Sequence, residues 1–361
     1  MEKKLDPAEL LSLMVRKNIS DIHFKADSRP LIRVNGRLKF IEGDPLSAEQ
    51  IEQIIDSLLT PEQKKILESE RELDFAYSVS NIARFRVNAY YQRGSAALAL
   101  RVVPLKILNF ADLNLPVDTL EKLASESRGL ILISGITGAG KTTTLNAIID
   151  YINNNFSYNI VMVEDPIEYY HQDVKSAISQ REVGGDTHSF ARALHYVLRQ
   201  DPDVVVIGEM RDFESISAGI TAAETGHLVL STIHTIDAVQ TIDRIIDMYP
   251  VHQQNTVRQQ LANILKGIVS QRLLVCNDGN SRVPVTEILL GTGIVRKIIA
   301  EGKIIELYKA MEQGAYYGMH TFDQDILRIY REGKISIEEA LDKATNPDDL
   351  NLQLRGISRE Q

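Results

Sequence analysis

The sequence predicts an α/β protein in two parts, a smaller α+β domain followed by a larger P-loop domain built on a mostly parallel sheet. From about residue 117, short apolar runs typical of strands alternate with helix-like segments, which is the pattern of a parallel sheet. A glycine-rich stretch, "GITGAGKT", joins the first of these strands to the first of these helices. Before residue 105, hairpin signals are mixed with helix starts, as in an α+β domain.

Composition narrows the class of protein. With 361 residues the chain is long enough for two separate cores, and its 44% hydrophobic and 25% charged residues are ordinary for a globular protein. A net charge of −9 disfavours a nucleic-acid partner. The single cysteine, Cys276, excludes a disulfide framework and a cysteine-rich zinc site within the chain. Neither a secretory signal pattern nor an apolar run near the roughly 20 residues of a membrane span is present, so we expect a cytoplasmic protein.

The first 104 residues carry recognisable element boundaries. The apolar spacing over residues 5–17 predicts a helix, and Asn35-Gly36 between two apolar runs predicts a β-hairpin turn. Ser47 in a capping-box pattern, and Thr60 followed by proline, predict the starts of two further helices.

A later strand in this part has two chemically different faces. Apolar residues alternate with Arg84, Arg86 and Asn88, so one face is apolar and the other basic. Residues 105–116 are bounded by prolines and lack periodicity, and we interpret them as a linker.

The larger part, residues 117–361, begins with four expected buried strands separated by helices. The strands are "GLILIS", "YNIVMVED", "DVVVIGE" and "HLVLSTIH". The last hundred residues look helical, with capping-box patterns at Thr321 and Ser336.

The stretch from Gly135 to Thr142 fits the phosphate-loop pattern G-x-x-x-x-G-K-[ST] between a strand and a helix. Its glycines let backbone N–H groups turn toward phosphate oxygens, while the helix N-terminus adds its positive dipole end. Lys141 is expected to reach the β- and γ-phosphates, and the Thr142 hydroxyl to bind Mg²⁺. The alternative is a glycine-rich turn that matches by chance. The predicted ATP-binding residues are Gly135, Thr137, Gly138, Ala139, Gly140, Lys141, Thr142 and Thr143.

Carboxylates follow the next strand. Glu164 ends it, at the edge of the sheet where α/β nucleotide sites form, and we predict that it accepts a proton from the attacking water. Glu168, beyond Pro166, is predicted to brace the loop. The alternative is that these acids cap the following helix.

The next two strands end in further candidates. Glu209 is predicted to be a Walker B residue that acts on Mg²⁺ through water, although Gly208 stands where many P-loop enzymes have an aspartate. His234 is predicted to sense the γ-phosphate, with His227 supporting it. The alternatives are a surface glutamate at a strand end and two structural histidines.

Taken together, these segments resemble the secretion and pilus ATPases of the GspE/PilB/PilT superfamily. They match its Walker A motif, its "EDPIE" Asp box, its Gly-Glu Walker B motif and its "GH…STxHT" His box. Over nearly the whole chain, stretches such as "RFRVNAYYQRGSAALALRVVP" and "TFDQDILRIYREGKIS" resemble the type IV pilus twitching-motility (retraction) subgroup, of PilT/PilU type. Residues 293–303, "GIVRKIIAEGK", depart from the "AIRNLIRE" motif of that subgroup and keep Arg296 and Glu301.

The resemblance implies a PAS-like domain over residues 1–104, a linker over residues 105–116, and a RecA-like ATPase domain with C-terminal helices over residues 117–361. It implies ATP and Mg²⁺ as cofactors. It also implies a homo-hexameric motor that hydrolyses ATP to retract type IV pili, peripheral to the inner membrane at the pilus base. The expected partners are an inner-membrane platform protein and a paralogous retraction ATPase, with no nucleic acid.

The resemblance further implies that Arg84, Arg86 and Arg93 approach the nucleotide and stabilise γ-phosphate charge, as arginine fingers do. The alternative is a solvated basic face. Two other functions stay open at this point. One is a related pilus-assembly or type II secretion motor, and the other is a low-turnover accessory nucleotide-binding subunit of the retraction motor.

Overall fold

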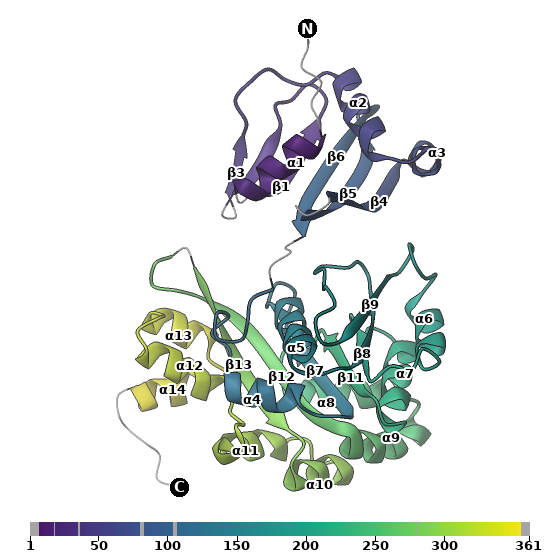
Figure 1. Ribbon diagram of the computed structural model, residues 1–361. Coiled ribbons are helices and arrows are strands. Elements are labelled where there is room, and N and C mark those ends of the chain that lie inside the picture. The colour runs from purple at the N-terminus through teal and green to yellow at the C-terminus, as the bar shows by residue number, and fades with distance from the viewer. Residues whose placement is uncertain are drawn as a thin grey trace. The chain divides into compact units, whose positions relative to one another are not determined.

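A computed structural model describes residues 7–17, 19–34, 37–79, 83–103, 107–279 and 281–354. The chain divides into two units, residues 1–106 with 168–170, and residues 107–167 with 171–361. Each unit is built around its own sheet (Figure 1). The expected α/β fold class is confirmed. In the part of the chain that the structure describes, none of the helices combines the length and apolarity that crossing a bilayer requires.

The first unit is an antiparallel sheet with its strands in the order β3-β2-β1-β6-β5-β4. Its apolar face packs against helices to form a separate core that includes Ile22, Phe24, Ile51 and Phe85. The strands are β1 (Ile19–Lys25), β2 (Leu31–Val34), β3 (Arg37–Phe40), β4 (Glu72–Val79), β5 (Ala83–Gln92) and β6 (Ser95–Val103). The helices are α1 (Pro7–Arg16), α2 (Ala48–Leu58) and α3 (Pro61–Glu70).

The helix starts expected in this unit are confirmed. The Ser47 hydroxyl accepts the Gln50 N–H while the Gln50 side chain accepts the Ser47 N–H, and the same reciprocal pair forms at Thr60. The expected turn residues Asn35-Gly36 lie outside the described residues. The strands on either side of them, β2 and β3, pair as an antiparallel hairpin with Val34 opposite Arg37.

The second unit is a sheet in the order β13-β12-β7-β11-β10-β8-β9, in which all neighbours are parallel except β12 and β13. Strands β7, β10 and β11 are buried along their whole length, as expected for a sheet covered on both faces. The strands are β7 (Gly129–Ser134), β8 (Asn159–Glu164), β9 (Ala177–Glu182), β10 (Val204–Ile207), β11 (Leu228–Ile233), β12 (Leu265–Val275) and β13 (Arg282–Leu290).

Helices cover this sheet, and the last three gather beside β12 and β13 (Figure 1). Thr321 and Ser336 cap helix starts there as predicted. The helices are α4 (Val117–Ala124), α5 (Lys141–Asn155), α6 (Phe190–Val197), α7 (Phe213–Glu224), α8 (Ala238–Asp247), α9 (Val251–Ile264), α10 (Gly293–Glu301), α11 (Glu306–Glu312), α12 (Phe322–Arg331), α13 (Ile337–Lys343) and α14 (Pro347–Leu354).

One expectation about the second unit is wrong, and one of its strands was not expected. The last hundred residues are not all helical, because β12 and β13 extend the sheet beyond β7. Both strands are buried on two faces and therefore lack the alternation that identifies a half-buried strand. Strand β9 was also missed, since its sequence "AISQRE" is polar and lies at the sheet edge.

The expected linker, residues 105–116, is too long. Phe110 and Leu115 are buried in the core of the second unit, which begins at residue 107. These two side chains have no helical or strand spacing around them, so their sequence gave no sign that they are packed.

The cap at Ser47 yields a stability prediction. We expect Ser47→Ala to lower the free energy of unfolding of the first unit by about 1 kcal/mol, because the Gln50 N–H loses its acceptor. Chemical denaturation followed by circular dichroism measures this change. Ser69→Ala, in the last turn of α3, is the matched control and is expected to leave the unfolding free energy nearly unchanged; an equal loss in both variants contradicts the cap.

Candidate functional site

The predicted residues converge because the strands that carry them are neighbours. In the order β7-β11-β10-β8 all pairs are parallel, so their carboxyl ends meet at one edge of the sheet (Figure 1). The glycine-rich loop follows β7, and Glu164 is the last residue of β8. Glu209 follows β10, and His234 follows β11. Segments up to a hundred residues apart thus form one site.

The loop has the geometry of a phosphate cradle. Gly135, Gly138 and Gly140 have φ values of 150°, 80° and 89°, a region that residues with a Cβ avoid. The loop runs into α5, whose first turn has no side-chain cap among the described residues. Lys141 is buried, and its Nζ donates to the carbonyl oxygens of Gly135 at 2.9 Å and Ile136 at 3.1 Å. N–H groups at a helix start with a lysine inside the loop suit a polyphosphate.

Gln271 on β12 supports this loop, and the sequence did not reveal it. A Cβ on Gly135 would lie 2.6 Å from the Gln271 carbonyl oxygen, and one on Gly140 would lie 2.7 Å from its Nε2. Thr144 donates from Oγ1 to Gln271 Oε1 at 2.6 Å. Gly135 is therefore required for close approach to a backbone oxygen as well as for its φ angle, whereas a Cβ at Gly140 would meet only the end of the Gln271 side chain. No signal pointed to Gln271, because β12 itself was not predicted.

Glu164 is buried at the end of β8, where its Oε1 accepts a hydrogen bond from Gln180 Nε2 at 2.9 Å. Gly208 lies directly beside it. A Cβ at Gly208 would lie 3.2 Å from the Val163 carbonyl oxygen and 3.3 Å from Glu164 Cα. The glycine that stands in place of an aspartate thus leaves room for the backbone and Cγ of Glu164.

The loop after Glu164 contains a cis peptide bond between Asp165 and Pro166. Glu182 on β9 holds it, since its Oε2 accepts the Ile167 N–H at 3.2 Å. Glu168 is exposed, and its predicted bracing role stays a prediction. The carboxylate that contacts the loop backbone is thus Glu182, which sequence reasoning missed together with β9.

Two predicted residues, Glu209 and His234, are brought into contact. Glu209 Oε1 lies 3.1 Å from His234 Nε2 and 2.8 Å from Arg211 Nε. Partial burial acts to raise the pKa of Glu209, but the hydrogen bond from Arg211 and the charges of His234 and Arg211 outweigh it, so the pKa is lowered. Glu209 is therefore held as a carboxylate. Arg211, two residues after Glu209, was missed.

His227 lies just before β11, where the sequence places it, and not beside His234. It precedes β11 whereas His234 follows it, so the two histidines lie at opposite edges of the sheet. His227 Nδ1 lies 3.0 Å from the Ala222 carbonyl oxygen and 3.1 Å from Thr225 Oγ1, at the end of α7. The two side chains therefore do not touch, because the strand between them spans roughly 20 Å. The predicted support of His234 by His227 stays a prediction.

His171 is a buried histidine that sequence reasoning passed over. Its Nε2 lies 2.7 Å from Asn146 Oδ1, on α5, and its backbone N–H donates to Gln180 Oε1 at 2.9 Å. Burial lowers the pKa of His171 to about 4, which keeps the imidazole neutral. The "YYH" sequence gave no sign of this role, since it depends on a helix and a strand that are distant along the chain.

The residues present fit a magnesium ion held mainly by nucleotide. Among the described residues no group of three or more His, Cys, Asp or Glu side chains could hold a metal ion. Mg²⁺ in phosphoryl-transfer sites takes one or two protein oxygens and completes its shell with phosphate and water. Thr142, in the first turn of α5, and the Glu209 carboxylate offer oxygens of that kind.

The predicted arginines belong to the first unit. Arg84 and Arg86 lie on β5 and share the face opposite to buried Phe85, and Arg86 is exposed. Arg93 is exposed in the turn after β5, with φ of 48°. Their role toward a nucleotide stays a prediction.

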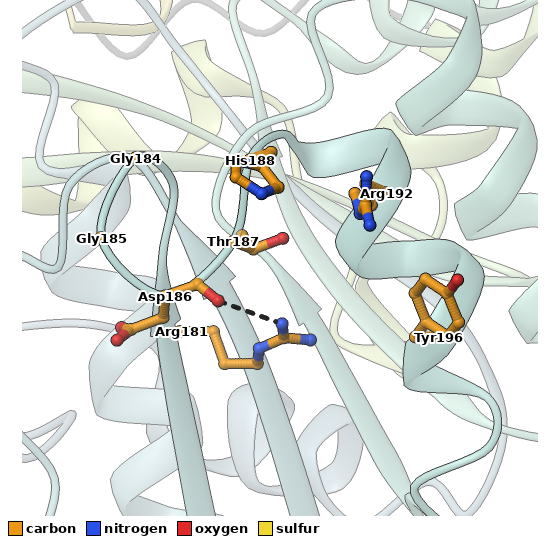
Figure 2. Close-up of a pocket in the computed structure, with 8 residues that line it drawn as sticks. All are labelled: Arg181, Gly184, Gly185, Asp186, Thr187, His188, Arg192 and Tyr196. Carbon is orange, nitrogen blue, oxygen red and sulfur yellow. Dashed lines mark hydrogen bonds between the residues drawn. The ribbon is translucent and has the colours of Figure 1, made fainter.

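A separate cavity of about 180 Å³ lies between the end of β9 and α6 (Figure 2). Its lining is basic and includes Arg181, His188 and Arg192, and Arg181 Nη2 donates to the Asp186 carbonyl oxygen at 3.3 Å. Successive strand residues point to opposite faces, so Arg181 points away from Gln180, its neighbour on β9. None of the loop or carboxylate residues described above lines this cavity.

Comparison with known proteins agrees with the geometry. The family model described as "Type II/IV secretion system protein" matches residues 2–342. The type IV pilus retraction ATPase PilT of Pseudomonas aeruginosa is 40% identical over 95% of this chain and 99% of its own length. The type IV pilus ATPase PilU of the same organism is 41% identical over 96% of this chain and 91% of its own.

A solved structure is equally similar. The crystal structure of the pilus retraction motor PilT with bound ADP superposes with a TM-score of 0.90 at 41% identity, covering 96% of this chain and 99% of that one.

The contact at Gly208 predicts a loss of catalytic rate. We expect Gly208→Ala to lower kcat for ATP hydrolysis by roughly tenfold or more while ATP affinity changes little, because the added methyl displaces Glu164. Steady-state ATPase assays and nucleotide titration measure both. Gly293→Ala is the control, because a Cβ there meets nothing within 4 Å. An unchanged kcat in Gly208→Ala contradicts the crowding argument.

Burial of neutral His171 predicts acid sensitivity. Its pKa is about 4 in the folded chain and 6.5 when unfolded, so between these values the unfolded state binds the extra proton. Stability should fall by up to about 3 kcal/mol as the pH drops from 6.5 to 4. Denaturation at several pH values should show a smaller pH dependence in His171→Gln, whereas the exposed His252→Gln should behave like the parent. An equal pH dependence in parent and His171→Gln is the contrary result.

Proposed function

The chain belongs to the family of type II/IV secretion system proteins, and from that premise we propose that it is the ATP-hydrolysing motor of type IV pilus retraction. The observation that supports the proposal most directly is the convergence of the phosphate loop, Glu164 and the Glu209–His234 pair at one sheet edge. Its similarity to PilT along nearly the full length of both chains supports retraction as the work performed.

The reaction is transfer of the γ-phosphoryl group of ATP to water. The loop N–H groups and Lys141 hold the triphosphate. The Glu164 carboxylate takes a proton from the attacking water as the water oxygen bonds to the γ-phosphorus and the bond to the β,γ-bridging oxygen breaks. The products are ADP and phosphate. His234 lies beside Glu209, where it can respond to loss of the γ-phosphate.

When bound, Mg²⁺ supplies charge neutralisation at the β- and γ-phosphate oxygens. We propose that Thr142 ligates it directly and that Glu209 acts on it through water. Arg211 and His234 hold the Glu209 carboxylate in place for this role. We also propose that Arg84, Arg86 and Arg93 act on the γ-phosphate charge of their own or a neighbouring subunit.

The proposed assembly is a homo-hexameric ring at the pilus base, on the cytoplasmic side of the inner membrane where ATP is available. Its proposed partners are an inner-membrane platform protein and a paralogous retraction ATPase. In a ring motor of this kind, nucleotide shifts each subunit between conformations. The free energy available for that shift is limited by how differently ATP and ADP bind the conformations.

One alternative has a specific observation in its favour. The chain is as similar to PilU as to PilT, at 41% and 40% identity. An accessory subunit with low turnover of its own is therefore the second candidate. A purified protein that binds ATP but hydrolyses it at the background rate would favour this alternative over the main proposal.

Two substitutions test the site. Lys141→Ala should abolish measurable ATP binding, whereas Glu164→Gln should keep ATP binding and lower kcat at least roughly 100-fold, because an amide cannot take the proton. Nucleotide titration and phosphate release measure the two effects. The exposed Glu214→Gln is the control and should hydrolyse ATP like the parent. Parental turnover by Glu164→Gln would remove the proposed base.

The cellular role is tested by deleting the gene. Retraction predicts hyperpiliated cells that do not twitch, and complementation by the parental gene but not by Glu164→Gln. Loss of pili in the deletion strain would instead indicate an assembly motor.

A further inference from the structure

Gln180 on β9 uses both ends of its side-chain amide. Its Oε1 accepts the backbone N–H of His171 at 2.9 Å, and its Nε2 donates to Glu164 Oε1 at 2.9 Å. A backbone N–H can only donate, so the carbonyl end of the amide has to face His171. The NH₂ end must then face the Glu164 carboxylate. The orientation of this amide is thus determined by its partners and not by an arbitrary choice of rotamer.

The same reasoning extends the chain of contacts to the phosphate loop. Asn146 donates from Nδ2 to the Thr142 carbonyl oxygen at 2.8 Å, so its Oδ1 faces the imidazole of His171. His171 Nε2 lies 2.7 Å from that oxygen and therefore carries the proton of the neutral ring. Contacts run without a break from Thr142, through Asn146, His171 and Gln180, to Glu164.

We propose that Gln180 is a positioning residue for ATP hydrolysis: it orients the Glu164 carboxylate toward the attacking water and ties it, through His171 and Asn146, to the loop that holds the triphosphate. The inference rests on the proposed function, because it takes Glu164 as the base. Gln180 touches neither water nor nucleotide in this role.

Physical reasons favour this role. Glu164 is buried, and burial alone disfavours the ionised form that a base requires. A hydrogen bond donated to a carboxylate is stronger than one between neutral groups, so the Gln180 amide stabilises that ionised form. It also favours one orientation of the carboxylate, which a base needs because small displacements from the attacking geometry reduce the rate strongly.

The link to Thr142 adds a coupling. Thr142 lies in the first turn of α5, next to Lys141, and Asn146 lies one turn further along the same helix. A shift of the first turn on nucleotide binding therefore moves Asn146 with it. Asn146 contacts His171, whose backbone N–H positions Gln180. The base is thus aligned when the loop is in its nucleotide-holding position.

Substitutions at Gln180 test the proposal in the full-length protein. Gln180→Met has nearly the same length but no donor and only a weakly accepting sulfur. Its kcat for ATP should fall roughly 10- to 100-fold while KM stays within about twofold. Gln180→Glu keeps the acceptor for His171 but sets a carboxylate against Glu164, and its kcat should fall at least as far. Parental kcat in either variant overturns the proposal.

Controls separate positioning from folding and from the proposed function. Gln172→Met makes the same change at an exposed site nearby and should have the parental kcat. A Gln180→Met protein whose KM rises in step with its loss of kcat, and whose thermal midpoint drops, shows a merely structural role and overturns the proposal. If Glu164→Gln is inactive while Gln180→Met is fully active, the positioning role fails and the proposed function stands. If Glu164→Gln is fully active, the proposed base itself fails.

Discussion

Parallel pairing of β7, β11, β10 and β8 is the constraint on which the site depends. These strands are only four to six residues long and are almost wholly buried, so charged side chains occur where they end but not along them. Because all four run in the same direction, those ends lie at a single edge. A slip of one residue in any pairing would turn each side chain of that strand to the other face and take its functional residue out of the site.

The site also requires neighbouring segments of the chain to approach each other closely, and glycine allows this at several positions. Gly135 and Gly140 lie against Gln271, and Gly208 lies against Glu164. At each of these positions a methyl group would meet a backbone or side-chain atom. The glycine-rich loop is therefore shaped from outside by β12 as well as from within by its own φ angles, and Glu164 gains its space from the glycine that follows β10.

A site for a polyanion can keep carboxylates close by because each of them is held by other groups. Glu209 is paired with Arg211 and His234, Glu182 accepts a loop N–H, and Glu164 accepts from Gln180. Partial burial acts to raise the pKa of Glu209, but the hydrogen bond from Arg211 and the charges of His234 and Arg211 lower it. Arg211 and His234 thus keep Glu209 ionised and in place, whereas a backbone N–H holds Glu182 and a neutral amide holds Glu164.

The sequence by itself determined the α/β class, the phosphate loop and the three strand ends that carry Glu164, Glu209 and His234, because each signal is local: a glycine pattern, an apolar run, a charge after it. Only the tertiary structure decided which side chains contact these residues. Strands β9 and β12 lack a clear period, so Gln180, Glu182 and Gln271 could not be foreseen. The sequence placed His227 and His234 at the two ends of one strand, but only the fold decided that His227 contacts Ala222 and Thr225. Hydrogen bonds between residues 16 to 127 positions apart depend on strand order, which local periodicity does not encode.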